Sequence, residues 1–458
     1  MTKRKIAVLV LAAGAGTRMK STRAKVLHPL AGRPMIAHVL ASAEGLKPDR
    51  IVAVVGEDME DVAEAVRPHP VAVQHPKLGT AHAVRAARKA LAGCTGPGSA
   101  VLVLYGDTPL IRTATLKAML AKLRSPAKPA VVVLGFRPAD PAQYGRLVVG
   151  SDGRLERIVE ARDASAAERR IPLCNAGAMA FDGKALFGLL AGIGRANAKR
   201  EYYLTDAVAV ARARGRSCAV VEAGETEVMG VNARAELALA ERAIQRDLRA
   251  RAMAEGATLI DPETVWFSFD TRLGRDVTVG PNVVFGPGVT VGDEAEIRGF
   301  CHVQGATIER GAIVGPFARL RPGARIGPGA HVGNFVEIKN AVLDEGAKAN
   351  HLAYVGDARV GARANIGAGT ITCNYDGFAK HETEIGEGAF IGSNTALVAP
   401  VRIGDRAVIG AGSTIAKDVA ADALAVTRAE QREIKNWTRR RAKASRRSAR
   451  ARATRKAR

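Results

Sequence analysis

The sequence is poor in cysteine and in aromatic residues, and it has no long apolar run. Its five cysteines are scattered over 458 residues without a CxxC pair, so neither a disulfide framework nor a zinc ribbon is indicated. Aromatic side chains are only 4% of residues, which leaves most core packing to aliphatic side chains. No apolar run approaches the roughly 20 residues that a membrane-spanning helix needs. These absences predict a protein of the reducing cytoplasm that does not enter a membrane.

The N-terminus superficially resembles a secretion signal. Basic residues from Lys3 to Lys5 precede an apolar run that begins at Ile6. The run ends at Gly14-Ala15-Gly16-Thr17-Arg18, which is typical of a buried strand that enters a glycine loop. We therefore interpret this run as the first strand of the fold.

The net charge of +23 is concentrated at the C-terminal end of the chain. Arg439–Arg458 contains eleven Lys and Arg and no acid, which leaves about +12 for the rest. A basic segment can bind nucleic acid, but this one lacks interleaved aromatic residues apart from the nearby Trp437. We expect residues 429–458 to form a basic, disordered tail without a nucleic-acid partner. The remaining positive charge suits small anionic substrates.

Residues 1–231 alternate apolar runs with helical stretches. The predicted strands are Ile6–Leu11, Ile51–Val55, Val101–Leu104, Val131–Gly135 and Cys218–Val221. The predicted helices include Met35–Glu44, Met59–Val66 and Ala81–Ala92. This alternation predicts a Rossmann-like α/β domain with a mostly parallel sheet covered on both faces. Ligands of such sheets bind beyond the carboxyl ends of the strands, where Gly14 and Asp107 both fall.

The pattern changes after residues 232–255, which are predicted to form a helical linker. Over residues 256–428 aliphatic side chains recur every six positions, often followed by glycine. The clearest series are Leu273, Val279, Phe285, Val291, Ile297 and Val303, then Ile308, Val314, Leu320, Ile326, Val332 and Ile338, and last Ile385, Ile391, Leu397, Ile403, Ile409 and Ile415. This period predicts a parallel β-helix, in which short strands meet at glycine-assisted turns. The polar segment Ile371–Glu384 interrupts the series and is expected to project as a loop.

The glycine loop after the first strand suits an anion. Gly14 and Gly16 let backbone N–H groups approach a phosphate closely, and Arg18 and Lys25 can neutralise its oxygens. The pattern is neither a Walker A loop nor a GxGxxG fingerprint. A plain tight turn explains the glycine pair equally well.

Further motifs extend this loop into a family resemblance. The chain resembles the sugar-nucleotide pyrophosphorylases, and specifically the bifunctional N-acetylglucosamine-1-phosphate uridyltransferases/glucosamine-1-phosphate acetyltransferases, over roughly residues 5–430. The matching segments of the first half are Leu11–Met19, Lys25, Pro29–Met35, Gln74, Leu78–Ala83, Tyr105–Asp107, Tyr144–Arg146, Glu160, Asn175–Gly177, Glu201–Asp206 and Gly230–Asn232.

The resemblance implies the residues of a uridyltransferase site. Those implied to hold the uracil and ribose are Leu11, Ala12, Ala13, Gly14, Gln74, Gly79 and Thr80. Those implied to hold the sugar are Gly145, Glu160 and Asn175, and further substrate contacts are implied for Lys25, Tyr105 and Gly106. Asp107 and Asn232 would ligate Mg²⁺, which prefers hard oxygen ligands. Without the resemblance, Asp107 is equally well explained as a turn residue.

The implied reaction is attack by N-acetylglucosamine 1-phosphate on the α-phosphorus of UTP, which expels pyrophosphate. The attacking phosphate is already an anion, so no protein base is needed. Alignment and charge neutralisation by Mg²⁺, Arg18 and Lys25 would supply the catalysis.

The second half resembles the acetyltransferase part of the same family, which implies a left-handed β-helix and a homotrimer with sites between subunits. The matching segments are Arg321–Gly323, Gly333–Lys339, His351–Tyr354, Asn365–Thr370 and Cys373–Gly377. His351 is implied as the general base, and a histidine suits the removal of a proton from an amine near neutral pH.

The same resemblance implies the remaining acetyltransferase roles. The backbone N–H of Ala368 would stabilise the oxyanion. Arg321 and Lys339 would bind the phosphate of glucosamine 1-phosphate, and Lys380 would reach a neighbouring subunit's sugar phosphate. Tyr354 and Asn365 would orient the sugar. Those implied to line the acetyl-CoA channel are Asn374, Tyr375, Ser393, Ala411 and Arg428.

The implied product is UDP-N-acetylglucosamine, a precursor of peptidoglycan and lipopolysaccharide. The sequence departs from the family pattern at Ala15, at Ala161-Arg162 and at Ala233, none of which carries an assigned role. An alternative is a pyrophosphorylase with a single activity, in which the β-helix is only structural. Cys373, next to the acetyl-CoA segment, is interpreted as a packing residue.

Overall fold

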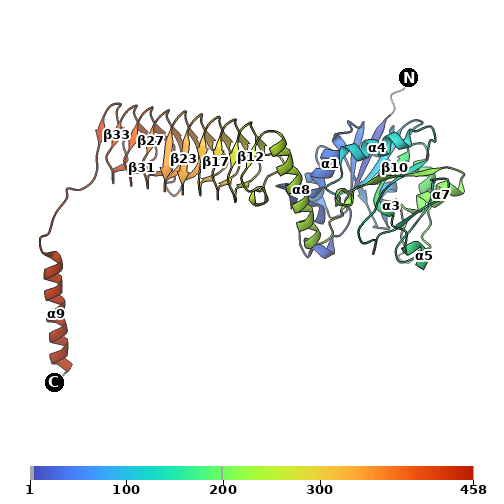
Figure 1. The fold of residues 1–458 in the computed structure, drawn as a ribbon, viewed down its shortest axis with the longest axis horizontal. Coiled ribbons are helices and arrows are strands. Elements are labelled where there is room, and N and C mark those ends of the chain that lie inside the picture. Colours follow the sequence, from blue (N-terminus) through green and yellow to red (C-terminus); the bar gives the residue numbers. More distant parts are fainter. Residues whose placement is uncertain (1–4, 198–199, 457–458) are drawn as a thin grey trace. The chain divides into compact units, whose positions relative to one another are not determined.

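The computed structural model describes residues 5–197 and 200–456, so Lys3, Arg4 and the last two residues of the predicted tail lie outside it. The chain forms two compact units. The first contains the chain up to Leu273 together with Val284–Val289, and the second contains Gly274–Val283 and the chain from Thr290 (Figure 1).

The first unit is built on a nine-stranded sheet whose central path runs in the order β11-β7-β10-β6-β1-β4-β5. Its apolar strands pair in parallel, as at the central pair β1–β6, whereas β10 is antiparallel to both of its neighbours. This confirms the mostly parallel sheet that the sequence predicted. The strands of the unit are β1 (Ile6–Leu11), β2 (Pro29–Leu30), β3 (Arg33–Pro34), β4 (Arg50–Gly56), β5 (Val71–Gln74), β6 (Ala100–Tyr105), β7 (Val131–Phe136), β8 (Arg146–Val149), β9 (Leu155–Val159), β10 (Cys174–Asp182), β11 (Cys218–Ala223), β12 (Thr258–Leu259), β13 (Arg272–Leu273) and β15 (Val284–Phe285).

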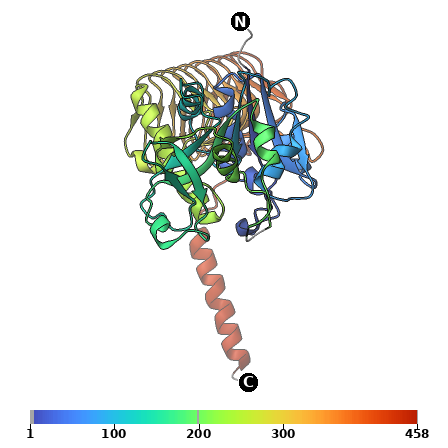
Figure 2. The same ribbon diagram turned by 90° about the vertical axis from the view of Figure 1, so that its right-hand side faces the viewer.

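Helices cover both faces of this sheet (Figures 1 and 2). One core cluster packs α3, α6 and α7 against the sheet, and the other packs α1, α2 and α4 against its opposite face. Burial on both faces explains why the central strands are continuous apolar runs. The helices of the unit are α1 (Met35–Glu44), α2 (Glu60–Ala65), α3 (Thr80–Ala86), α4 (Thr113–Leu123), α5 (Ala166–Arg169), α6 (Leu186–Ala191), α7 (Asp206–Ala213) and α8 (Arg234–Ala254), with 3₁₀ turns η1 (Thr17–Met19), η2 (Lys25–Leu27), η3 (Glu225–Val228) and η4 (Pro262–Thr264).

Helix α8 belongs to the first unit, so the boundary between units falls later than the predicted linker. Ala240 is buried in a cluster with Leu30 and Met35. The side-chain amide of Gln245 donates to the carbonyl of Phe267 and accepts from its N–H. The helix therefore packs as part of this unit, and its sequence pattern alone did not reveal these contacts.

The second unit is a parallel β-helix of very short strands, as the six-residue period predicted. Each strand pairs in parallel with its counterpart in the next coil, for example Val279 with Ile297 and Val332 with Ala349. The strands are β14 (Thr278–Val279), β16 (Thr290–Val291), β17 (Glu296–Ile297), β18 (His302–Val303), β19 (Thr307–Ile308), β20 (Ile313–Val314), β21 (Arg319–Leu320), β22 (Arg325–Ile326), β23 (His331–Asn334), β24 (Glu337–Leu343), β25 (Lys348–His351), β26 (Tyr354–Val360), β27 (Asn365–Ile366), β28 (Ile371–Cys373), β29 (Thr383–Ile385), β30 (Phe390–Ile391), β31 (Ala396–Val398), β32 (Val401–Ile403), β33 (Val408–Ile409), β34 (Thr414–Ile415) and β35 (Leu424–Ala425).

The inward side chains stack in columns from coil to coil. Partners along one column lie about 18 positions apart in the chain, as Val279 and Ile297 do. The spacing grows to 25 positions between Ile366 and Ile391, because the chain leaves the coil between β28 and β29. The tight stacking requires glycine at Gly333, where a Cβ atom would lie 2.0 Å from the carbonyl oxygen of Asn350.

The predicted disordered tail contains a helix, α9 (Trp437–Lys456). Residues 429–450 are all exposed, so no core drives this helix. Its physical basis is local: the segment is rich in arginine and alanine, which favour helix, and has no glycine or proline. None of the helices within residues 5–197 and 200–456 is long and apolar enough to cross a membrane.

The inward stacking predicts that truncation of two leucines of the β-helix lowers the free energy of unfolding by different amounts. Leu320 is fully buried in the stack, whereas Leu424 is 69% exposed. Leu320→Ala should lower the free energy of unfolding of the second unit by about 2–5 kcal/mol, because it leaves a cavity. Leu424→Ala should change it by about 0.5 kcal/mol or less. Urea unfolding followed by circular dichroism measures both, and equal losses would contradict the inward placement of Leu320.

Candidate functional sites

The first candidate site lies where strands β1 and β6 end side by side. Leu11 pairs with Tyr105 in the sheet, and the N–H of Gly106 donates to the carbonyl of Leu11 at 2.9 Å. The glycine loop after β1 and the acidic turn after β6 therefore share one edge of the sheet. A Cβ atom at Gly106 would lie 3.3 Å from the Leu11 oxygen, so the close approach of the two strand ends favours glycine there.

A cavity of about 300 Å³ opens at this edge. Most of the residues predicted to hold the nucleotide line it, namely Leu11, Ala12, Ala13, Gly14, Lys25, Gln74, Gly79, Thr80, Tyr105 and Asp107. Several of them are fixed by hydrogen bonds. The buried amide of Gln74 donates to the carbonyl of Gly79 at 3.0 Å, and the hydroxyl of Thr80 accepts from the N–H of Leu204. Burial, together with the negative charge of Asp107, raises the pKa of Tyr105 to about 12, so its hydroxyl stays protonated and able to donate.

The ammonium of Lys25 lies between the two predicted metal ligands. It forms an ion pair with the carboxylate of Asp107 and donates to Oδ1 of Asn232 at 3.1 Å. The N–H of Val231 donates to the carbonyl of Asp107, which fixes the two segments to each other. One cation thus already bridges both oxygens. In the described part of the chain no three His, Cys, Asp or Glu side chains group around one point. Two protein oxygens suit Mg²⁺, which takes its remaining ligands from phosphate and water.

The three residues predicted to hold the sugar also lie together. The N–H of Asn175 donates to the carbonyl of Gly145 at 2.8 Å, and a Cβ atom at Gly145 would lie 3.6 Å from a carboxylate oxygen of Glu160. Glu160 in turn accepts from the hydroxyl of Thr205 at 3.5 Å.

Arg18 is not brought into the nucleotide cavity. It lies exposed in η1 and does not line the cavity, whereas Lys77 and Glu201 do. Lys77 was missed by the sequence reasoning, which attended to the glycine loop. The sequence did contain a feature that could have indicated Lys77: it is a cation two residues before Gly79, the residue that caps helix α3.

The second candidate site follows one corner of the β-helix. The chain passes this corner once per coil, and backbone hydrogen bonds between successive passes link neighbouring coils. These bonds join Leu352 to Asn334, Gly369 to His351, Asn394 to Ala368 and Gly412 to Ser393. The guanidinium of Arg428 then donates to the carbonyl of Ala411 at 2.8 Å. The resulting corner column contains Asn334, His351, Ala368, Ser393, Ala411 and Arg428. The structure thus aligns the predicted base with four of the residues predicted to bind acetyl-CoA or the oxyanion.

Asn334 orients the imidazole of His351. Nδ1 of the histidine lies 2.7 Å from the amide oxygen of Asn334. Because that oxygen only accepts, Nδ1 carries the proton and Nε2 keeps its lone pair. Nε2 is therefore the atom that can take a proton from an amine. His351 and Asn334 line a cavity of about 290 Å³ together with His331, Phe317 and Phe335.

A cluster of cations gathers on the adjacent face of the coils. The amines of Lys380 and Lys339 interact, which lowers the pKa of Lys380; this interaction and that with Asp357 raise the pKa of Lys339. The positive charge of Arg321 also acts on Lys380. Lys380 thus lies beside Lys339 of its own chain. Three cations against the carboxylates of Asp357 and Glu337 suit a phosphate ligand.

Asp357 is the centre of this cluster and was missed by the sequence reasoning. Its buried carboxylate pairs with Lys339 at 3.0 Å and accepts from the amides of Asn340 and Asn374. Asn374 in turn donates to the hydroxyl of Tyr354 at 3.4 Å. Asp357 therefore joins a predicted phosphate ligand, a predicted sugar ligand and a predicted acetyl-CoA ligand. The coil period was the available signal, since Asn340 and Asn374 each lie one coil from Asp357.

Two predicted residues are placed outside these contacts. Asn365 lies in β27, between Lys348 and Phe390 of the neighbouring coils. Tyr375 lies in the projecting loop, 61% exposed, and its hydroxyl donates to the carbonyl of Gly377. Cys373 is half-buried and, like the other four cysteines, is a free thiol.

Comparison with known proteins matches both units. Residues 8–172 match the family model of the MobA-like NTP transferase domain, and residues 270–305, 305–340 and 382–417 match that of the bacterial transferase hexapeptide (six repeats). The bifunctional protein GlmU of Paramagnetospirillum magneticum is 61% identical over 440 residues, which are 96% of this chain and 97% of that protein. The bifunctional protein GlmU of Rhodospirillum rubrum is 63% identical over 433 residues, 94% of this chain and 96% of that protein.

The hydrogen bonds of Asp357 predict an acid-sensitive contribution to stability. Burial alone would raise its pKa, but the bonds from Asn340, Lys339 and Asn374 outweigh burial and lower the pKa below its ordinary value. Stability from a lowered carboxylate pKa is present above the unfolded-state pKa of about 4 and is lost as the pH falls through the folded-state pKa. Asp357→Asn should therefore cost about 3–5 kcal/mol at pH 7, where it leaves Lys339 unpaired, and progressively less below pH 4.

Urea unfolding from pH 7 to pH 3 measures this difference. Asp422→Asn, which removes an exposed partner of Arg406, is the matched control and should lower the free energy of unfolding much less than Asp357→Asn does at pH 7. A cost at Asp357 that does not change with pH would contradict the role of its charge.

Proposed function

The chain belongs to the family of bifunctional GlmU proteins, and from this premise we propose that it makes UDP-N-acetylglucosamine in two steps. The second unit transfers an acetyl group from acetyl-CoA to glucosamine 1-phosphate. The first unit then transfers UMP from UTP to N-acetylglucosamine 1-phosphate and releases pyrophosphate. The observation that carries the proposal is the corner column, which aligns His351 with the predicted acetyl-CoA residues in a chain that also has a nucleotide cavity. Such a column argues against the alternative of a merely structural β-helix.

Uridyl transfer depends on placing two anions against each other. Gln74, Gly79 and Thr80 would hold the nucleoside part of UTP, and Gly145, Glu160 and Asn175 would hold the acetylated sugar. Asp107 and Asn232 would hold Mg²⁺, which neutralises charge on the phosphates when it is bound. Lys25 already lies at these oxygens and can turn its ammonium to a phosphate once a metal takes its place. Arg18, exposed at the glycine loop, remains available to contact the pyrophosphate as it leaves.

Acetyl transfer depends on one proton and one oxyanion. The amine of glucosamine 1-phosphate attacks the thioester carbon, and Nε2 of His351 takes the proton from nitrogen as the bond forms. The N–H of Ala368 stabilises the developing oxyanion. Arg321, Lys339 and Lys380 bind the sugar phosphate, while Tyr354 and Asn365 orient the sugar. Asn374, Tyr375, Ser393, Ala411 and Arg428 hold acetyl-CoA along the corner, and coenzyme A leaves as the thiol.

The same unit carries an exposed aromatic ladder that supports a homotrimer. Phe300, Phe317 and Phe335 stack on one another at centroid distances of 4.9 and 5.2 Å, each about half exposed. All three have positive φ angles, a strained conformation for large side chains. A contiguous exposed aromatic row is typical of a surface that another chain covers. We assign it to the contact between subunits of a closed threefold assembly, which works in the cytoplasm on small substrates.

The two activities should separate by single substitutions. Purified protein is incubated with glucosamine 1-phosphate, acetyl-CoA, UTP and Mg²⁺, and mass spectrometry follows the intermediate and the final product. Asp107→Ala should still acetylate but lose uridyl transfer by about 100-fold or more, because it removes the stronger metal ligand. His351→Ala should lose acetyl transfer by about 100-fold or more. It should still convert added N-acetylglucosamine 1-phosphate.

Asp422→Asn, which breaks an exposed ion pair with Arg406 and changes no residue assigned to either reaction, is the control and should keep both activities. Pyrophosphate release by Asp107→Ala near the wild-type rate would overturn the metal assignment. Acetylation by His351→Ala at the wild-type rate would overturn the base assignment.

Charge placed in the aromatic ladder should break the trimer. Phe317→Glu would put carboxylates into a buried aromatic contact, so light scattering should report monomers where the wild type gives trimers. Leu424→Glu, an exposed apolar position outside the ladder, should leave the trimer intact. A monomeric wild type, or a trimeric Phe317→Glu, would refute the assignment.

A further inference from the structure

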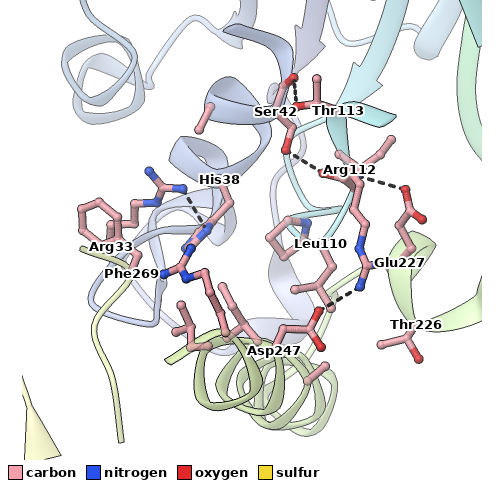
Figure 3. A pocket seen from close by; sticks show the side chains of 17 residues that line it. Arg33, His38, Ser42, Leu110, Arg112, Thr113, Thr226, Glu227, Asp247 and Phe269 are labelled. Atoms are coloured by element: carbon pink, nitrogen blue, oxygen red, sulfur yellow. Dashed lines mark hydrogen bonds and ion pairs between the residues drawn. The ribbon is translucent and has the colours of Figure 1, made fainter. Parts of the chain in front are cut away.

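The first unit contains a second cavity, separate from the nucleotide cavity and larger, at about 500 Å³. It lies between helix α1, the chain segment that follows β6, η3 and helix α8, with Phe269 at one side (Figure 3). None of the residues assigned to either reaction lines it. Cavities of roughly 300–1,000 Å³ are the size that proteins use for small organic ligands.

One wall of this cavity presents a cation that lacks a carboxylate partner. The guanidinium of Arg33 lies over the ring of Phe269, 4.3 Å from its centre. It donates to Nδ1 of His38 at 3.1 Å, while Nε2 of the same histidine donates to the carbonyl of Leu30. Burial lowers the pKa of His38 to about 4, so this ring is neutral and does not compete with Arg33 for an anion.

The hydrogen-bonding capacity of Arg33 is only partly used. Its Nε is buried and has no hydrogen-bond partner among the described residues. Burial lowers the pKa of Arg33, and the negative charges of Glu44 and Asp270 offset only part of that effect; neither carboxylate forms an ion pair with Arg33 in the described part of the chain. A half-buried guanidinium with an unused donor is the arrangement that a carboxylate or phosphate oxygen completes.

The opposite wall carries two arginines, Arg112 and Arg251, and two carboxylates, Asp247 and Glu227. Arg112 pairs with Asp247 at 2.9 Å, and its N–H donates to the carboxylate of Glu227 at 3.0 Å (Figure 3). Between the two walls lie apolar side chains that include Leu110, Ile244 and Leu248. The cavity therefore combines a net positive charge, three arginines against two carboxylates, with an apolar surface.

We propose that this cavity binds a small organic anion. Its carboxylate or phosphate contacts Arg33, and its apolar or aromatic body packs against Leu110 and Ile244. On the opposite wall Arg112 and Arg251 offset Asp247 and Glu227, so that wall adds no net charge that would repel the ligand.

The cavity is connected to the metal ligands of the uridyl site. The segment after β6 contributes Asp107 to that site and Leu110 to the cavity. The segment that contains Glu227 leads to Asn232. Two hydrogen bonds join these segments, from Val231 to Asp107 and from Arg112 to Glu227. A ligand in the cavity therefore contacts one end of a pair of segments whose other end holds Asp107 and Asn232, and its binding is coupled to that of UTP and Mg²⁺. This coupling rests on the proposed uridyl transfer, whereas the binding does not.

Calorimetry on the full-length protein tests the binding. The probes are benzoate, phenyl phosphate and benzamide, the last being an uncharged match for benzoate. Benzoate or phenyl phosphate should bind at least tenfold more tightly than benzamide, and comparison of the two anions distinguishes a carboxylate site from a phosphate site. Equal binding of benzoate, phenyl phosphate and benzamide would overturn the proposal. So would the absence of binding of either anion at about 10 mM, a concentration at which even a weak ligand binds.

Variants locate the bound probe. Arg33→Gln should weaken the preferred anion at least tenfold, Arg33→Lys should restore most of the preference for it over benzamide, and Ile244→Trp should abolish binding by filling the cavity. Arg137→Gln, which breaks an exposed ion pair of the same unit, is the control and should bind as the wild type does. Undiminished binding in both Arg33→Gln and Ile244→Trp would place the probe elsewhere and refute the site.

The coupling has its own measurement. The affinity of the preferred anion is measured with and without saturating UTP and Mg²⁺, and it should differ at least threefold. An identical affinity would refute the coupling. Uridyl transfer by Asp107→Ala at the wild-type rate would instead refute the proposed function. The two failures are therefore distinguishable.

Discussion

The stacking of inward side chains constrains everything else in the second unit. Each coil must return an aliphatic or small side chain to the same column, because a change of register would move a whole set of side chains from the core to the solvent. Fully buried residues such as Val314, Val332 and Ala349 satisfy this requirement in successive coils. The outward positions then repeat with the same regularity. Asn334, His351 and Ala368 are aligned because the core beneath them is aligned.

The two sites solve different electrostatic problems. In the first unit a single ammonium, that of Lys25, lies against the oxygens of Asp107 and Asn232, so the cation needed by a phosphate ligand is held by the groups that would bind a metal. In the second unit the balance is reversed. Arg321, Lys339 and Lys380 lie against the carboxylates of Asp357 and Glu337, and the excess positive charge suits a phosphate directly. Both sites use a buried or half-buried carboxylate to hold a lysine in place.

The sequence predicted the elements whose side chains follow one regular pattern of burial. Continuous apolar runs gave the central strands β1, β4, β6 and β7 nearly to the residue, and the six-residue period predicted the β-helix. Strand β10 was missed because its first half, around Asn175 and Gly177, is polar and lies at the ligand edge of the sheet. Helix α3 is shorter than predicted, because Ala-rich sequence continues beyond the point where the helix ends.

The candidate sites were predictable as sets of residues, through family resemblance, and not as geometry. Hydrogen bonds such as His351 to Asn334 and Asn374 to Asp357 join residues one coil apart, so local sequence patterns do not contain them. The cavity beside Arg33 combines α1 with α8, more than 200 positions apart in the chain, and only the folded structure brings them together.

The corner column also fixes the distances between the groups along it. Neighbouring coils are separated by the strand spacing of a β-sheet, about 4.8 Å, so the interval between His351 and Ala411 is set by the number of coils between them and not by loop conformation. Three steps along the corner amount to roughly 14 Å. A long, flexible acyl carrier bound along this edge would therefore contact groups at fixed intervals. Gain or loss of a whole coil would move the reacting end by one strand spacing and leave the packing of the core intact. A protein of this kind can therefore change the length of its binding site in discrete steps.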